Sequence, residues 1–242
     1  MILITRPLAD AQMTAEALKE RGYDSIQAPV LRISPLNFTL PAAEEIDALM
    51  VTSHNAADLM HHLQQSYKMK PVYAIGRRTT DSLRQAGFSR IIEGSGTGPE
   101  LTKRLMRDLS PQSRILHLCG RHLSSESEAA KKMQDLLHIN NMPVYEALEV
   151  TTLPEAVLKA LKNQTIHSAI FFSARTLSIF ENLCVQHDVT DTLQHIEALC
   201  LSPNVLRSAT LSYWRDVRAA TDPQTDCLYA LLDTAAADVS MT

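Results

Sequence analysis

Short apolar runs alternate with longer amphipathic stretches along the whole chain. A buried strand takes about four to eight apolar residues, whereas a helix that covers a sheet shows one apolar face over ten or more. Strands and helices that alternate in this way build parallel sheets, so the pattern predicts an α/β fold. The predicted strands are 2–4, 26–31, 48–51, 72–75, 90–92, 115–118, 169–172 and 198–201.

The second half of the chain repeats the pattern of the first. The runs at 2–4 and 115–118 each precede a predicted helix and then a Pro-Val strand, at Pro29 and Pro143, which begins 27 and 28 residues later. Self-similarity at a fixed offset indicates two copies of one structural unit. Further runs match in the same order, 49–51 with 169–172 and 72–75 with 198–201.

The chain is expected to form two domains and to cross twice between them. Its 242 residues allow one large domain or two small ones, at roughly 150 residues each. Segments 31–40 and 143–152 have strand composition and polar ends, which favours them as crossings. One domain is then central, at 37–143, and the other is discontinuous, built from 1–36 and 144–242.

Composition and charge exclude several classes of protein. Apolar residues make up 45% and charged residues 21%, as in ordinary globular proteins. A net charge of −4 provides no overall basic field, so neither nucleic acid nor a membrane surface is an expected partner. No apolar run approaches the ~20 residues of a membrane span, and a signal-peptide pattern is missing.

The four cysteines are expected to be reduced thiols, because they are far apart and form no C-x-x-C pair. This predicts a cytoplasmic protein, and the small net charge favours a monomer. The cysteines are Cys119, Cys184, Cys200 and Cys227.

Hydroxyl residues and glycines follow nearly every predicted strand. In open parallel sheets, ligands bind beyond the carboxyl ends of the strands, where helix N-termini present free N–H groups. Each hydroxyl taken alone is better explained as a helix N-cap. Their recurrence in both copies indicates an anion-binding cleft. The positions are Thr5-Arg6, Thr52-Ser53, Gly76-Arg77, Gly94–Gly98, Gly120-Arg121, Ser173 and Ser202–Asn204.

The loop Gly94–Gly98 lacks both nucleotide-binding motifs. A dinucleotide fingerprint needs glycine where Pro99 stands, and no lysine follows in register for a P-loop. No nucleotide cofactor is therefore expected. The loop can still hold a carboxylate through its N–H groups, or it is a flexible connector.

A group of histidines lies on a helix predicted from His54 to about Tyr67. His54, Asp58, His61 and His62 have spacings that bring several of them onto one face. No second cluster completes a coordination shell, so these residues predict a solvated helix face and no metal site.

Tyr145 is the candidate for proton transfer. It follows Pro143 at a predicted crossing, and a phenol there can donate a proton to a departing oxygen; a strand tyrosine with no catalytic role is the alternative. Ser53 and Ser173 lack the G-x-S-x-G setting of an activated nucleophile. His117, in the middle of a strand, is interpreted as a core histidine.

Several short segments form a recognisable pattern through their order and spacing: Ile2–Pro7, Ala28–Leu31, Val51–Ser53, Ala74–Gly76 with Thr79-Thr80, Leu118–Gly120, Val144–Glu146 and Phe171–Ser173. In this order they resemble uroporphyrinogen-III synthases over nearly the whole chain. The resemblance implies two flavodoxin-like α/β domains joined by a two-stranded linker.

The resemblance also implies an activity. Members of the family cyclise hydroxymethylbilane to uroporphyrinogen III without a cofactor, with loss of water and inversion of ring D through a spiro intermediate. The free bilane closes to the uninverted isomer, so such an enzyme acts mainly by orientation. The upstream bilane-forming enzyme is a candidate for transient contact.

The resemblance implies a set of site residues. Tyr145 matches the family's tyrosine that assists departure of the hydroxyl. The substrate-binding candidates are Thr52, Ser53, Gly76, Gly96, Thr97, Gly120, Ser173 and Asn204.

One segment departs from the family pattern. After the strand at 198–201, the usual glycine and threonines are replaced by Ser202-Pro203-Asn204. Asn204 can still bind a carboxylate arm, whereas a side chain at Ser202 restricts backbone approach. The departure leaves a second hypothesis, a non-catalytic protein of the same fold that binds an anion or a partner. A nucleotide-dependent transferase is the third, and the missing glycine motifs argue against it.

Overall fold

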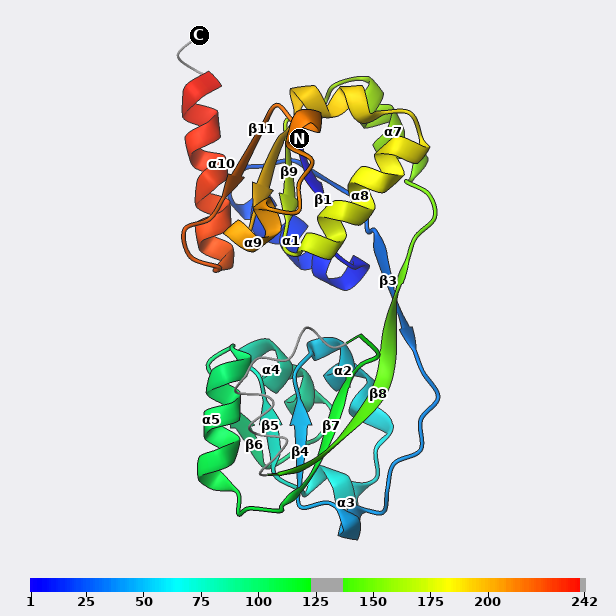
Figure 1. Cartoon of the computed structure of the whole chain (residues 1–242), viewed down its shortest axis with the longest axis vertical. Helices are drawn as coiled ribbons and strands as arrows, with labels where there is room; N and C mark the ends of the chain where they lie inside the picture. Colours follow the sequence, from blue (N-terminus) through cyan, green and yellow to red (C-terminus); the bar gives the residue numbers. More distant parts are fainter. Residues whose placement is uncertain (123–136, 240–242) are drawn as a thin grey trace. The chain divides into compact units, whose positions relative to one another are not determined.

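The chain forms two compact units in a computed structural model that describes residues 1–122 and 137–239 (Figure 1). Unit 1 consists of Met1–Arg32 and Leu148–Thr242, and unit 2 consists of Ile33–Ala147. The helix predicted between 120 and 143 falls mainly on positions outside the described residues. No helix in the described part of the chain is long and apolar enough to cross a membrane.

Unit 1 is a parallel sheet with helices on both faces. The strands run in the order β2-β1-β9-β10-β11, which numbered within the unit is the flavodoxin-like order 2-1-3-4-5. The strands are β1 (Ile2–Ile4), β2 (Ser25–Gln27), β9 (Ser168–Phe171), β10 (Glu197–Cys200) and β11 (Asp216–Ala219). The helices are α1 (Leu8–Glu20), α7 (Glu155–Lys162), α8 (Ala174–Gln186), α9 (Pro203–Leu206) and α10 (Thr225–Val239), with 3-10 turns η3 (Thr190–His195) and η4 (Leu211–Tyr213).

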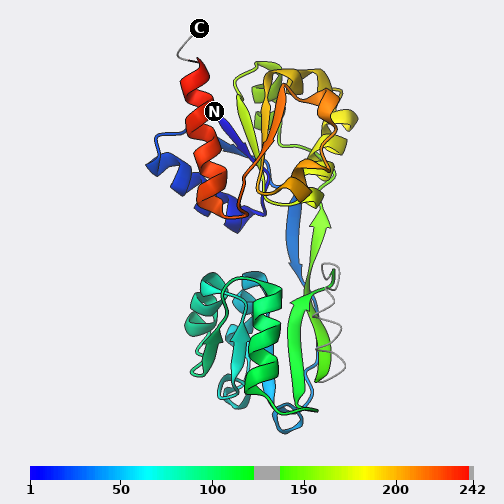
Figure 2. The ribbon, with the colours of Figure 1, turned by 60° about the vertical axis from the view of Figure 1, so that its left-hand side comes forward.

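The core of unit 1 follows from the alternation of side chains along its strands. Ile2 and Ile4 pack with apolar residues of α1 and α10 on one face, where both helices lie beside the sheet (Figure 2). On the other face, the ring of Phe171 contacts Phe180 of α8 and Trp214, with centroids 5.9 and 5.5 Å away. Successive residues of a strand point to opposite faces, so each short strand contributes to both layers.

Unit 2 is a second α/β sheet, in the order β3-β8-β7-β4-β5-β6. Its strands are β3 (Leu31–Pro35), β4 (Ala48–Val51), β5 (Val72–Ala74), β6 (Ile91–Glu93), β7 (Arg114–Gly120) and β8 (His138–Glu149). Its helices are α2 (His54–Asp58), α3 (Gln65–Lys68), α4 (Arg77–Gln85) and α5 (Gly98–Asp108), with 3-10 turns η1 (Ala43–Glu45) and η2 (Leu59–His62). Leu49 and Val51 pack toward α2 and α4, while Ala48 and Met50 pack toward α5.

The two sheets have the same arrangement of strands in space, but the chain visits the strands in a different sequence in each. Without β3, unit 2 reads β8-β7-β4-β5-β6, and unit 1 reads β2-β1-β9-β10-β11. The strands that the sequence repeat matches occupy equivalent places: β7 with β1, β4 with β9 and β5 with β10. The predicted α/β class and its repeated unit are therefore confirmed.

The strand predicted over 26–31 is wrong as a single element. It forms β2 in the sheet of unit 1 and β3 in the sheet of unit 2. Pro29 stands between them, and a proline has no N–H to donate to a strand ladder. The chain therefore leaves one sheet at this point and joins the other.

The units divide at 32/33 and 147/148, within the predicted crossing segments 31–40 and 143–152, whereas the predicted domain boundaries are 36/37 and 143/144. Backbone hydrogen bonds join the two chain segments that lie near these boundaries. Leu36 N donates to Val144 O at 2.9 Å, and Val150 N donates to Val30 O at 3.1 Å. The two connecting segments are thus hydrogen-bonded to each other through β3 and β8.

Candidate active site

The chain order of unit 2 reverses between β4 and β7. From β4 the chain continues to β5 and β6 on one side, and from β7 it continues to β8 on the other. Ligands of open parallel sheets bind at such a reversal, beyond the carboxyl ends of the strands. Thr52-Ser53 follow β4, and Gly120-Arg121 end β7. These residues therefore flank the position where a ligand is expected.

Tyr145 of β8 reaches this position. Its hydroxyl donates a hydrogen bond to Ser53 Oγ at 3.0 Å. Ser53 is also the N-cap of α2, and its Oγ accepts from the backbone N–H of Asn55 at 3.2 Å. Because Ser53 Oγ accepts two hydrogen bonds, its own proton is left to donate to a bound molecule.

Gly120 makes room for the tyrosine ring. A β-carbon at Gly120 would lie 2.9 Å from Cζ of Tyr145 and 3.0 Å from Oη. The register between β7 and β8 shifts at this point, so that Cys119 pairs with Pro143 but Gly120 pairs with Tyr145. The N–H of Arg121 donates to Tyr145 O at 2.8 Å, which holds the tyrosine backbone at the end of β7.

Thr52, next to Ser53, is held by a buried histidine. The Thr52 hydroxyl lies 2.8 Å from Nε2 of His117, and Nδ1 of His117 lies 2.8 Å from Oδ1 of Asn141. His117 is 6% exposed, and burial lowers its pKa while the hydrogen bond with Asn141 opposes this. The interpretation of His117 as a core histidine is confirmed, and one of its partners is a candidate substrate-binding residue.

The glycine loop packs against the end of β5. The N–H of Gly96 donates to Ile75 O at 2.7 Å, and a β-carbon at Gly76 would lie 3.1 Å from the α-carbon of Gly96. Gly96 has a φ of +96°, which a residue with a side chain rarely adopts. Thr97 is exposed at the N-cap position of α5, without a side-chain capping bond. The structure thus brings Gly76 and Gly96 together.

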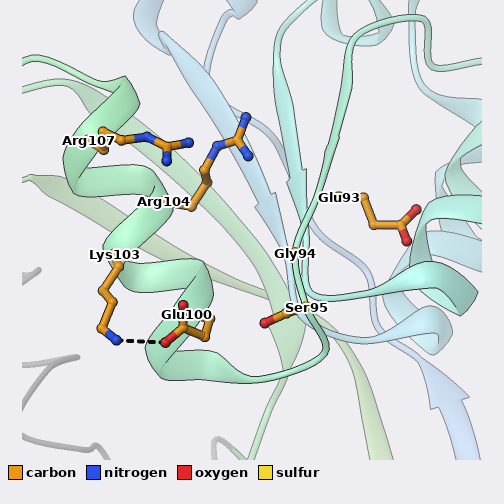
Figure 3. Close-up of a pocket in the computed structure, with 7 residues that line it drawn as sticks. All are labelled: Glu93, Gly94, Ser95, Glu100, Lys103, Arg104 and Arg107. Atoms are coloured by element: carbon orange, nitrogen blue, oxygen red, sulfur yellow. Dashed lines mark hydrogen bonds and ion pairs between the residues drawn. The ribbon is translucent and has the colours of Figure 1, made fainter.

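A hollow of about 420 Å³ lies on the other side of this loop, along α5 (Figure 3). Lys103 pairs with Glu100 at 2.6 Å, and Arg104 and Arg107 both contact Asp108. The three cations that line the hollow are therefore already paired with carboxylates. The hollow adjoins β6, an edge strand that is separated from β8 by three other strands. Its lining is Glu93, Gly94, Ser95, Glu100, Lys103, Arg104 and Arg107.

The candidates of unit 1 lie at the ends of β9 and β10. Ser173 caps α8, and its Oγ accepts from the N–H of Thr176 at 3.2 Å. Ser202 precedes α9 with a φ of −156°, which is extended backbone open to any residue, so serine causes no backbone strain there. Asn204 is exposed on α9, and its Oδ1 accepts from Arg207 at 3.4 Å.

The helix predicted from His54 to Tyr67 is wrong as one continuous element. It is divided into α2, η2 and α3, so the spacing of one continuous helix, which is expected to bring several of the four side chains onto one face, does not hold across the segment. His61 and His62 belong to the 3-10 turn η2. Within the described residues, no three His, Cys, Asp or Glu side chains are grouped so as to hold a metal ion.

Comparison with known proteins places the chain in one family. The model of the uroporphyrinogen-III synthase HemD family matches residues 12–230. A candidate uroporphyrinogen-III synthase of Archaeoglobus fulgidus is 21% identical over 207 residues, which is 84% of each chain.

Two solved structures share the fold. Uroporphyrinogen-III synthetase from Helicobacter pylori is 15% identical, with a TM-score of 0.63 over 97% of this chain and 98% of that one. A mutant uroporphyrinogen-III synthase from Thermus thermophilus is 14% identical, with a TM-score of 0.52 over 100% and 99%. The family match covers most of the residues, including Tyr145 and the strand ends that carry Thr52-Ser53 and Ser173. The chain belongs to the uroporphyrinogen-III synthase family.

Proposed function

We propose that this chain cyclises hydroxymethylbilane to uroporphyrinogen III with Tyr145 as the group that assists loss of water. Membership of the family makes the chain a hydro-lyase of tetrapyrrole biosynthesis. The observation that supports the role of Tyr145 is its hydrogen bond to Ser53, 3.0 Å long, beside the reversal of the sheet. A phenol with a nearby hydroxyl can exchange its hydrogen-bond partner for a leaving oxygen without a backbone movement.

In the proposed reaction, Tyr145 donates its proton to the hydroxyl that leaves the ring A carbon. The C–O bond breaks, water departs, and the pyrrole nitrogen stabilises the resulting cation. The substituted carbon of ring D then attacks, and the spiro intermediate opens and recloses with ring D inverted. Final closure releases one proton from ring D, which the phenolate of Tyr145 takes back. Atoms balance with loss of one water and no redox change, so the reaction as written uses no cofactor.

Substrate binding is proposed to use the strand ends. Ser53 has a proton to donate to a carboxylate or hydroxyl oxygen, and the backbone at Gly76 and Gly96 can approach a ligand closely because no side chain intervenes. Thr52, Thr97 and Gly120 complete the proposed set in unit 2. In unit 1, the proposed carboxylate-binding groups are Ser173 and Asn204, which lie at equivalent strand ends.

We also propose that the chain is cytoplasmic and, because its net charge is only −4, a monomer. The thiols of Cys119, Cys184 and Cys200 are free and buried. Burial raises the pKa of Cys119 to about 11 and those of Cys184 and Cys200 to about 12. Cysteines that remain free thiols agree with a reducing compartment, where disulfides are rare.

The test is a coupled assay in which freshly generated hydroxymethylbilane is added and the oxidised product is separated into type I and type III isomers. The unmodified chain is expected to yield type III. Tyr145→Phe is expected to lower kcat by about 100-fold or more, as for loss of a general acid, with type III still the enzymatic product. Tyr67→Phe is the matched control, because the Tyr67 hydroxyl donates to Pro41 O at 2.7 Å in the same unit, away from this site.

Two outcomes would contradict the proposal. Unchanged kinetics in a folded Tyr145→Phe variant would remove this residue from the mechanism. Type I product alone, formed at the spontaneous rate in the presence of the folded unmodified chain, would contradict the synthase activity and support a non-catalytic binding protein.

A further inference from the structure

Thr52, His117 and Asn141 form a row of hydrogen bonds across three neighbouring strands. In the sheet of unit 2, β7 lies between β4 and β8, and His117 pairs in register with Met50 on one side and Asn141 on the other. Both ring nitrogens of His117 are occupied, Nε2 by the Thr52 hydroxyl and Nδ1 by Asn141 Oδ1, each at 2.8 Å. The imidazole is thus fixed from both sides in the interior of the sheet.

The partners of His117 determine where its proton lies. The Asn141 amide is oriented with Oδ1 toward Nδ1 of His117, and because a carbonyl oxygen can only accept, this orientation places the hydrogen on Nδ1. A neutral imidazole has one N–H, which leaves Nε2 as an acceptor. The ring is 6% exposed, and burial favours its neutral form. Nε2 must therefore accept the proton of the Thr52 hydroxyl.

Thr52 consequently offers a hydrogen-bond acceptor to a ligand, whereas Ser53 offers a donor. The single proton of Thr52 is committed to His117, so its oxygen presents only lone pairs. Ser53 accepts from the N–H of Asn55, and also from Tyr145 until that hydroxyl turns to the leaving oxygen, so in both states its own proton is available to a ligand. A carboxylate arm has no proton to give to Thr52, whereas a pyrrole N–H donates and has no lone pair to accept with.

From this arrangement we infer that His117 is a positioning residue that fixes Thr52 as the acceptor for a pyrrole N–H of the substrate. The inference rests on the proposed function, because it takes the substrate to be a tetrapyrrole. It assigns the two adjacent hydroxyls to different parts of that substrate: Thr52 to a pyrrole nitrogen, and Ser53 to an oxygen.

The first test reads the tautomer directly. Long-range proton–nitrogen NMR spectra of the ¹⁵N-labelled full chain at neutral pH are expected to show His117 protonated at Nδ1 and unprotonated at Nε2. His117→Gln identifies the resonances by their loss. A proton on Nε2, or on both nitrogens, would overturn the inference, and this readout does not depend on activity.

The second test compares paired variants in the bilane assay. Thr52→Val keeps the shape of the side chain but removes the acceptor, and it is expected to raise KM about tenfold with a smaller change in kcat, as for one lost hydrogen bond. Thr52→Ser is expected to regain most of the lost affinity. His117→Leu should raise KM as Thr52→Val does, whereas the amide oxygen of His117→Gln can replace Nε2 as acceptor and restore most of the affinity.

The outcomes separate this inference from the proposed function. An unmodified chain that makes only type I product overturns the proposed function and, with it, the assignment of a pyrrole. An active chain in which Thr52→Val has an unaltered KM overturns the inference alone. So does a folded His117→Gln variant with the same defect as His117→Leu. If His117→Leu does not fold, the KM values of the two Thr52 variants and the tautomer of His117 still test the inference.

Discussion

The ring of Tyr145 lies against the α-carbon of Gly120, so closely that a β-carbon at residue 120 would approach Cζ to 2.9 Å. The phenol reaches Ser53 because β7 offers no side chain at its last residue. The position of the proposed proton donor is thus determined by a glycine on the neighbouring strand as well as by its own backbone.

Gly120→Ala is therefore expected to displace Tyr145 from Ser53. A contact of 2.9 Å must lengthen by several tenths of an ångström, and small misplacements of catalytic groups are costly. We expect kcat to fall by roughly 10- to 100-fold, with a circular dichroism spectrum like that of the unmodified chain. Gly98→Ala is the control, because a β-carbon at Gly98 meets nothing within 4 Å. Equal activity of the two variants would contradict this role of Gly120.

Ser53 caps helix α2 and also accepts the hydrogen bond of Tyr145. Two substitutions distinguish the effect of the cap on stability from the effect of the Tyr145 contact on activity. Ser53→Ala removes both the cap of α2 and the acceptor for Tyr145, so it should lower the free energy of unfolding by about 1 kcal/mol and also lower kcat. Ser53→Gly should recover most of the stability, because glycine is a tolerated N-cap, but not the activity. Urea unfolding and the bilane assay measure the two effects, and activity that recovers together with stability would show that only the cap matters.

The strand ends could be predicted from the sequence, but most side-chain partners could not. Short apolar runs bounded by polar residues define where a parallel strand stops, and Thr52, Ser53 and Gly76 follow directly. The Ser53–Tyr145 bond joins residues 92 positions apart, and it depends on the register shift between β7 and β8 after Cys119. A pattern of apolar residues does not reveal such a shift, since the same apolar strands would also form a sheet in an unshifted register.

His117 illustrates a different limit. One polar residue within an apolar strand correctly indicated a buried, satisfied histidine. Its partners come from two other strands, Thr52 beyond β4 and Asn141 on β8. Only the order of strands in the sheet shows that these side chains meet, so the connection to a candidate binding residue could not be read from spacing along the chain.

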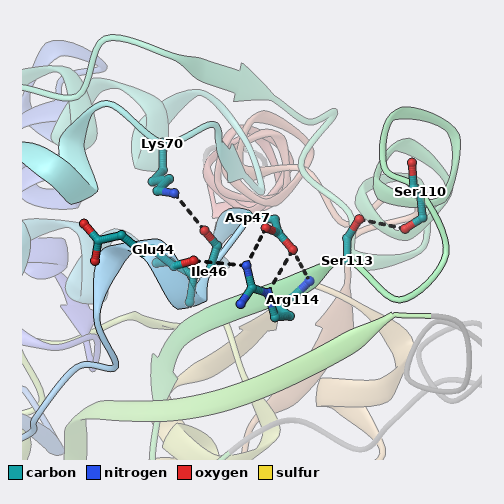
Figure 4. A network of polar contacts seen from close by, with 7 residues as sticks. All are labelled: Glu44, Ile46, Asp47, Lys70, Ser110, Ser113 and Arg114. Atoms are coloured by element: carbon teal, nitrogen blue, oxygen red, sulfur yellow. Dashed lines mark hydrogen bonds and ion pairs between the residues drawn. The ribbon is translucent and has the colours of Figure 1, made fainter.

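A polar network at the opposite ends of the same strands is expected to contribute to stability and not to activity. At the amino ends of β4 and β7, the guanidinium of Arg114 faces both carboxylate oxygens of Asp47 (Figure 4). The N–H of Arg114 also donates to Asp47 at 2.8 Å. These hydrogen bonds hold the pKa of Asp47 below its usual value of 3.8. The network lies at the end of the strands away from Tyr145.

Asp47→Asn is expected to lower stability and leave kcat unaltered. The pair is partly exposed, so the loss should be about 0.5–1 kcal/mol in urea unfolding at neutral pH. A lowered folded-state pKa stabilises the protein above 3.8, and this contribution is lost as the pH falls through the folded-state value. The difference between the two proteins should therefore shrink in acid. A fall in kcat for the folded variant would contradict the separation of this network from the site.

The buried histidine makes stability depend on pH in the opposite direction from a histidine with an acidic partner. Burial lowers the pKa of His117 below 6.5, so the unfolded chain binds a proton more readily than the folded one. The contribution of His117 to the free energy of unfolding should therefore be full above pH 6.5 and fall as the pH drops toward the folded-state pKa, by at most about 1.4 kcal/mol per pH unit. His167 has a pKa lowered mainly by burial as well, and it contributes in the same direction. His117→Gln should keep the part due to His167 and show a shallower fall. Urea unfolding at a series of pH values measures both slopes, and an equal slope in the two proteins would mean that His117 does not remain neutral in the folded chain.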